Sequence, residues 1–79
     1  MVRERYGESG IRIVFGDGID EATHETVRRF FLHFRSLRVP GVIDIIRSFR
    51  TCLIHFDNGR VRYEELCERI DSAGTEWQE

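Results

Sequence analysis

The chain has no lysine, and all 12 of its basic side chains other than histidine are arginines. This absence excludes a Schiff-base lysine and a lysine that cradles phosphates. Positive and negative side chains are nearly equal in number, and the net charge is −2. No overall field therefore draws the chain onto nucleic acid or an anionic membrane, and we expect neither as a partner.

Long apolar runs and cysteines are also scarce. No stretch has the roughly 20 apolar residues that cross a bilayer, and Arg3, Glu4 and Arg5 interrupt the apolar segment of a signal peptide. Two cysteines, Cys52 and Cys67, are too few for a disulfide framework. Each has an apolar position in its element, so we expect buried free thiols rather than a bridge or a reactive site. These features fit a cytoplasmic protein.

The apolar residues that are present suffice for one small core. Hydrophobic residues make up 41% of the 79 residues and include six phenylalanines. A chain of this size buries roughly 60% of its unfolded surface, which supports one domain at most. We expect that domain to span residues 1–74, with residues 75–79 as a frayed tail.

The spacing of apolar residues predicts four strands and two helices. The predicted elements are strands over 2–6, 11–15, 42–49 and 51–56 and helices over 21–38 and 61–72. Asp20 is a good N-cap for the first helix, Pro40 and Gly41 end it, and Gly74 ends the second. The order (β)β-α-ββ-α predicts an α+β fold, a two-layer sandwich whose antiparallel sheet carries both helices on one face.

Both helices have an apolar stripe that would cover one face of the sheet. In the first helix the stripe is Val27, Phe30, Phe31, Phe34 and Leu37, and in the second it is Tyr63, Leu66, Cys67 and Ile70. The opposite face then stays open and carries Arg12, Val14, Thr51, Leu53 and His55. Such a face, with aliphatic residues among polar ones, is either a docking surface or an ordinary solvated sheet. We expect a homodimer through it.

The residues that usually carry catalysis do not assemble into a site. His24 and His33 are nine positions apart on the first helix, so they face opposite directions and cannot share a metal ion. Cys52 and His55 are three positions apart on one strand, so they lie on opposite faces of it. We therefore predict no catalytic residue and no metal ligand.

Arginines supply the remaining candidate site. Arg47 and Arg50 flank the connection between the last two strands, where paired guanidiniums would bind a carboxylate or a phosphate. The alternative is that Arg50 hydrogen-bonds carbonyls in its own turn. With the residues of the open face, the predicted binding residues are Arg47, Arg50, Thr51, Leu53 and His55.

Two blocks of the chain carry a family resemblance. They are Val14-Phe15-Gly16 with Ile19-Asp20, and Gly41-Val42 with Phe49-Arg50-Thr51-Cys52-Leu53-Ile54-His55-Phe56-Asp57. Through these blocks residues 5–71 resemble the N-terminal domain, a carboxyltransferase-domain subdomain, of a family with three well-known members. These are the B-type subunit of bacterial 5-oxoprolinase, the sporulation-kinase inhibitor KipI and the first subunit of allophanate hydrolase. Glu8, Gly10, Arg47 and Thr51 depart from the family's usual residues.

The resemblance implies a DCoH-like α+β fold and an accessory or partner-binding role in an ATP-dependent amide-hydrolysing complex, without catalysis by this domain alone. It implies ATP as the cofactor of the complete complex and no cofactor in this domain. The implied partner is a hydrolase subunit or a C-terminal cyclophilin-like domain that this chain lacks. The alternative is a stand-alone KipI-like regulatory module that binds a histidine kinase or another protein.

A ferredoxin-like metal-transfer domain is a third interpretation, based on the second half of the chain. Such a domain needs a Cys-x-x-Cys pair near the start of its first helix to hold a soft metal. Residues 16–24 contain no cysteine, which disfavours this interpretation.

Overall fold

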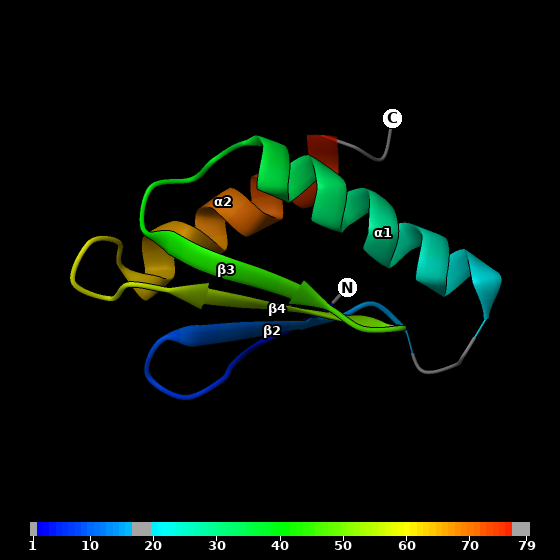
Figure 1. Cartoon of the computed structure of the whole chain (residues 1–79), viewed down its shortest axis with the longest axis horizontal. Coiled ribbons are helices and arrows are strands. Elements are labelled where there is room, and N and C mark those ends of the chain that lie inside the picture. The colour runs from blue at the N-terminus through cyan, green and yellow to red at the C-terminus, as the bar shows by residue number, and fades with distance from the viewer. Residues whose placement is uncertain (1, 17–19, 77–79) are drawn as a thin grey trace.

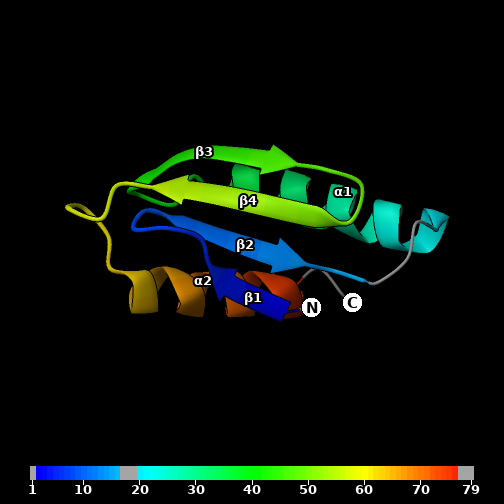
Figure 2. The same cartoon turned by 90° about the horizontal axis from the view of Figure 1, so that it is seen from below.

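The computed structural model describes residues 2–16 and 20–76. Its elements are strand β1 (Val2–Arg5), strand β2 (Gly10–Val14), helix α1 (Glu21–Ser36), strand β3 (Val42–Arg47), strand β4 (Thr51–Phe56) and helix α2 (Tyr63–Glu76). The strands form one sheet in the order β1-β2-β4-β3, and every neighbouring pair is antiparallel. Both helices lie on the same side of this sheet (Figures 1 and 2). The predicted α+β fold is confirmed.

The core lies between the two central strands and the helices. Ile11 pairs with Ile54 and Ile13 with Cys52 across β2 and β4, and all four side chains are fully buried. Side chains alternate between the two faces of a strand, so these four residues point together toward the helices. The helices meet them with fully or almost fully buried side chains, namely Val27, Phe30, Phe34, Leu66 and Ile70.

Helix α1 begins where the sequence predicts. The Asp20 side chain accepts a hydrogen bond from the Thr23 amide at 2.7 Å and so caps the first turn. The helix ends at Ser36 instead of Arg38, because Arg38 has a φ of 49° in the left-handed region and turns the chain away. The predicted burial of Leu37 is wrong, since its side chain is 41% exposed.

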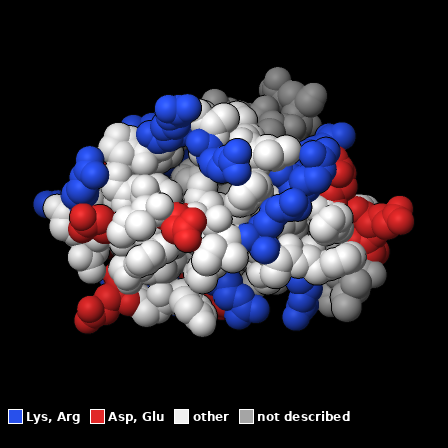
Figure 3. Space-filling model, viewed as in Figure 1, with Lys and Arg blue, Asp and Glu red and all other residues white. Residues whose placement is uncertain are grey.

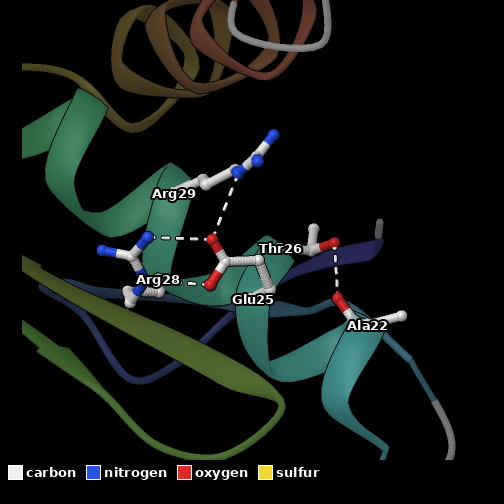
Figure 4. Close-up of polar contacts among 5 residues, drawn as sticks. All are labelled: Ala22, Glu25, Thr26, Arg28 and Arg29. Atoms are coloured by element: carbon white, nitrogen blue, oxygen red, sulfur yellow. Dashed lines mark hydrogen bonds and ion pairs between the residues drawn. The ribbon is translucent and has the colours of Figure 1, made fainter.

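Charged side chains stabilise the solvent side of α1 (Figure 4). The Glu25 carboxylate accepts hydrogen bonds from Arg28, at 3.0 and 2.8 Å, and from Arg29 at 3.2 Å. The bonds from Arg28 are the main reason that the pKa of Glu25 is lowered to about 2. One turn earlier, the Thr26 hydroxyl donates to the Ala22 carbonyl. Because these groups are exposed to water, they stabilise the helix only slightly.

Helix α2 runs past its predicted end. The stop expected at Gly74 is wrong, because the helix continues through Thr75 and Glu76; residues 77–79 of the expected tail lie outside the described residues. A single glycine costs a helix only about 1 kcal/mol, which the packing of the preceding turns offsets. The predicted inward positions of Leu66, Cys67 and Ile70 are confirmed.

Strand β1 is attached to α2 by two arginines. The Arg3 guanidinium donates two hydrogen bonds to the Asp71 carboxylate, at 2.9 and 3.0 Å. The guanidinium carbon of Arg5 lies 4.6 Å from the centre of the Tyr63 ring. All four β1 side chains are exposed, so these polar contacts hold the strand where apolar burial does not.

Gly41 joins α1 to β3 at a point where no side chain fits. Its φ is 93°, and a Cβ added there would lie 2.6 Å from the Val61 Cγ1 atom. Its carbonyl also accepts a hydrogen bond from the Asp57 amide at 2.7 Å. The residue therefore determines how closely the start of β3 packs against the segment that leads into α2.

We predict that Gly41→Ala destabilises the domain by about 2 kcal/mol or more, because strained backbone and a steric clash act together. Gly7→Ala is the matched control, since Gly7 has a φ of 71° but no atom within 4 Å of its added Cβ. That variant should lose only about 1 kcal/mol from backbone strain. Urea unfolding of both variants measures the difference, and equal losses would contradict the clash.

The buried thiol of Cys52 gives a second prediction. Burial raises the pKa of Cys52 from 9.0 to about 12, and the nearby Arg47 charge opposes this only in part. The stabilisation from a neutral thiol is therefore complete below pH 9 and is lost as the pH rises toward 12.

We expect iodoacetamide at mildly alkaline pH to leave Cys52 unmodified in the folded protein and to alkylate it after unfolding in urea. Peptide mapping by mass spectrometry measures the labelled fraction. Equal labelling of Cys52 in the folded and unfolded chains would show that the thiol is accessible.

Candidate functional site

The open face of the sheet carries the five residues that the sequence predicts there. Arg12 pairs with Leu53, Val14 with Thr51, and Gly10 with His55 across β2 and β4. Directly opposite residues point to the same side of a sheet, so these side chains lie together on the face away from the helices. The predicted placement is confirmed, and Figure 1 shows that neither helix covers this side.

Two hollows on this face meet at the side chains of Tyr6 and Leu53. The first has a volume of ≈ 250 Å³ and the second of ≈ 320 Å³. The first is also lined by Arg12, Ile46, Arg47, Ser48 and Thr51, and the second by His55 and residues 7–10. The hollows are open to solvent and lie side by side along β4.

The open face is apolar toward β3 and charged toward β1 at the level of Leu53. Ile46 on the edge strand β3 pairs with Leu53 on β4, and the Ile46 side chain remains 54% exposed. On the other side of Leu53, Arg12 on β2 forms an ion pair with Glu4 on β1 at 3.2 Å. Exposed aliphatic side chains beside a charged pair form a surface that another protein can cover.

Arg47 lines the first hollow beside Thr51 and Leu53, but neither its guanidinium nor that of Arg50 joins the other predicted binding residues. Arg47 pairs with the buried Cys52, so its side chain points toward the helices, where its guanidinium carbon lies 5.3 Å from the centre of the Phe31 ring. Arg50 donates a hydrogen bond to the Gly16 carbonyl at 3.3 Å. The structure therefore brings together Thr51, Leu53 and His55 on one face and places both guanidiniums elsewhere.

The Arg50 side chain bonds to the carbonyl of Gly16, which lies outside the β3–β4 turn. In addition, the backbone carbonyl of Arg50 accepts a hydrogen bond from the Phe15 amide at 2.9 Å. Through these two bonds the β3–β4 turn holds the end of β2, so Arg50 has a structural role whether or not it also binds an anion.

The open face presents few groups for acid–base or metal chemistry. His55 is exposed there, whereas the Cys52 thiol is buried on the other side of β4, as predicted. Thr51 and Ser48 share a hydrogen bond between their hydroxyls. In the described part of the chain, no group of three or more His, Cys, Asp or Glu side chains could hold a metal ion. The arrangement is suited to binding a surface.

Glu4, Tyr6 and Ile46 also belong to the open face, although the sequence pattern does not predict them there. Strand β1 is short and fully exposed, so its pattern does not show which face each residue takes. In β3, strict alternation from Val42, which pairs with the buried Phe56, would have placed Ile46 toward the helices. The register shift between Val42 and Asp44 turns it to the open face instead. Only the pairing with β4 shows the direction of its side chain.

Neither helix in the described residues is long and apolar enough to cross a membrane.

Solved structures with the same fold come from much longer proteins. A conserved uncharacterized protein from Pyrococcus horikoshii matches with a TM-score of 0.89 and 19% identity, over 95% of this chain and 35% of its own. The urea amidolyase of K. lactis matches with a TM-score of 0.87 and 17% identity, over 94% of this chain and 4% of its own. At these identities the similarity shows the shared fold.

The Kluyveromyces lactis urea carboxylase also matches with a TM-score of 0.87 and 17% identity, over 94% of this chain and 7% of its own. The present chain thus spans about a third or less of the length of these proteins. A comparison with curated protein sequences found no match.

The family is shown by the sequence. The family described as carboxyltransferase domain, subdomain C and D, matches residues 1–79, which is every residue of the sequence. This agrees with the motifs at Val14-Phe15-Gly16 and Phe49–Asp57. The family resemblance predicted from the sequence is confirmed, and the chain belongs to the family of carboxyltransferase-domain subdomains C and D.

Proposed function

We propose that this domain is an accessory, partner-binding part of a 5-oxoprolinase- or allophanate-hydrolase-type subunit. It acts in an ATP-dependent amide-hydrolysing complex and is not catalytic alone. Family membership over residues 1–79 supports the class of complex. The fold shared with a urea amidolyase and a urea carboxylase supports an origin in multidomain amide chemistry.

The observation that carries the proposal is the uncovered face of the sheet. Both helices pack on the other side, and the open face has neighbouring aliphatic side chains at Ile46 and Leu53 with two adjoining hollows. Exposed aliphatic side chains on an open sheet face favour burial against another surface. The occupant is the rest of the carboxyltransferase-type assembly, because the similar structures contain this fold as a small share of a longer chain.

The residues of the domain indicate which functions the partner must supply in this complex. The chain has no lysine and therefore no phosphate-binding loop of the Gly-x-x-x-x-Gly-Lys type, so the proposal assigns ATP to the partner. Cys52 is buried, and its pKa is raised to about 12, which removes it as a nucleophile. The domain would therefore supply a surface that positions the catalytic parts.

We expect the purified chain alone to hydrolyse no ATP in the presence of 5-oxoproline or allophanate. Mixed with the hydrolase subunit of the same organism, it should restore ATP hydrolysis that depends on one of these amides. Phosphate release measures both reactions. If the chain binds no such subunit, or if a histidine kinase is the protein that it inhibits, the proposal is wrong.

We predict that Leu53→Glu weakens association with the hydrolase subunit about tenfold or more, because it buries a charge beside the exposed Ile46 in the interface. The fold should persist, since Leu53 is only partly buried and points away from the core. Leu32→Glu is the matched control, because Leu32 is 45% exposed and lies on α1, on the covered side of the sheet.

Titration calorimetry of both variants, after circular dichroism has checked their folding, measures the effect on binding. Equal affinities of the two variants would exclude the open face as the docking surface. The same comparison by light scattering, without the hydrolase subunit, tests the expected homodimer.

A further inference from the structure

A groove separate from the open face lies between the end of α1 and strand β3. Its volume is ≈ 290 Å³, and its walls include Phe31, Phe34, Arg35 and Arg38 on one side and residues 42–45 on the other. Strand β3 is the last strand of the sheet, so the groove follows an edge that no neighbouring strand covers among the described residues. Figure 3 views this side of the molecule, where arginine side chains are spread over the upper half and acidic side chains lie among and below them.

The backbone of β3 has hydrogen-bonding groups that point out of the sheet. The Ser48 amide donates to the Thr51 carbonyl, which closes the hairpin between β3 and β4. In an antiparallel pair, alternate residues bond to the partner strand. The Ser48 amide faces β4, and so do the amides of Ile46 and Asp44, two and four residues before it. The amides of Arg47 and Ile45 therefore face away from β4, where an added strand would bond to them.

One of these outward amides is occupied by a side chain of the same strand. The Asp44 Oδ1 atom accepts a hydrogen bond from the Ile45 amide at 2.9 Å. A carboxylate oxygen thus takes the place that the carbonyl of an added strand would take. Natural sheets use charged residues in this way to protect an edge from unwanted pairing.

The charge around the groove is mainly positive. The guanidinium carbons of Arg35 and Arg47 lie 5.5 and 5.3 Å from the centre of the same Phe31 ring, one coming from α1 and the other from β3. Among the described residues, no carboxylate lies within ion-pair distance of Arg35, Arg38 or Arg47, whereas Arg3, Arg12 and Arg28 each have one. Of the described residues that line the groove, Asp44 alone is acidic.

We infer that the β3 edge binds an extended acidic segment of a partner protein, which adds to the sheet as a fifth strand. Its backbone would displace Asp44 and bond to the amides of Ile45 and Arg47. Its carboxylates would meet the guanidiniums of Arg35, Arg38 and Arg47, and an apolar side chain would enter the groove beside Phe31. Ile43, 60% exposed at the register shift, would be covered by the same segment.

An extended peptide fits these features better than a small anion does. A small anion would use the guanidiniums alone, whereas the outward amides and the apolar wall form a line along the strand. This site lies at an edge of the sheet, although its Arg47 also lines the first hollow of the open face. Arg35, Arg38 and Asp44 line the groove and neither hollow, so variants of these residues test the edge site independently of the open face.

The test uses a capped peptide of about eight residues in which glutamate and valine alternate. Fluorescence anisotropy measures its affinity for the chain, and NMR follows the β3 amides. We expect the amides of Ile45 and Arg47 to shift and to exchange more slowly with solvent when the peptide is bound. A peptide with lysine in place of glutamate should bind at least about tenfold more weakly.

Protein variants distinguish the contribution of the arginine charges to peptide binding from that of the β3 backbone amides. Arg35→Glu combined with Arg47→Glu should lower the affinity about tenfold or more, while Arg69→Glu, an exposed arginine on α2, should change it less than about twofold. Asp44→Ala should raise the affinity several-fold, because it frees the Ile45 amide and removes a negative charge. Asp44→Asn keeps an acceptor oxygen and should raise it less.

The inference is overturned if the glutamate and lysine peptides bind equally, if Asp44→Ala weakens binding, or if the β3 amides do not respond. A response of the same amides to inorganic phosphate without any response to the peptide would also overturn it. Leu53→Glu should leave peptide binding unchanged, which distinguishes a failure at this edge from a failure at the open face.

Discussion

The structure depends on one constraint, which is that this small domain buries a single face of its sheet. Ile11, Ile13, Cys52 and Ile54 form a continuous apolar layer on the two central strands, and two helices are just enough to cover it. The described residues form no third layer. The outer face of the sheet and the edge at β3 are therefore left to water or to another protein.

The polar interactions have different roles in this arrangement. Asp20 and the Glu25 cluster act locally on α1, while Arg3 and Arg5 join the exposed strand β1 to α2. Arg50 connects the β3–β4 turn to the end of β2. Arg35 and Arg47 contact the ring of Phe31 and form no ion pair with another described residue. Arginines thus stabilise the fold at some positions, and at others they are candidates for binding a partner.

The proposed function places the domain within a larger assembly. The shared fold occupies a small share of a urea amidolyase and a urea carboxylase, and under the proposed function the uncovered sheet face would contact the rest of the assembly. The β3 edge would extend the same sheet sideways, because backbone hydrogen bonding continues beyond the last strand unless something blocks it. At Asp44 the block is a single side chain.

The sequence by itself determined the fold class, the helix start at Asp20 and the two sheet faces, because these follow from local periodicity and capping. It predicted the placement of Thr51, Leu53 and His55 for the same reason. The tertiary structure alone decided which way Arg47 and Ile46 point, since a register shift near Val42 breaks the alternation. It also decided the extension of α2 through Gly74 and the exposure of Leu37, because packing of the preceding turns and the left-handed turn at Arg38 outweigh local propensity there.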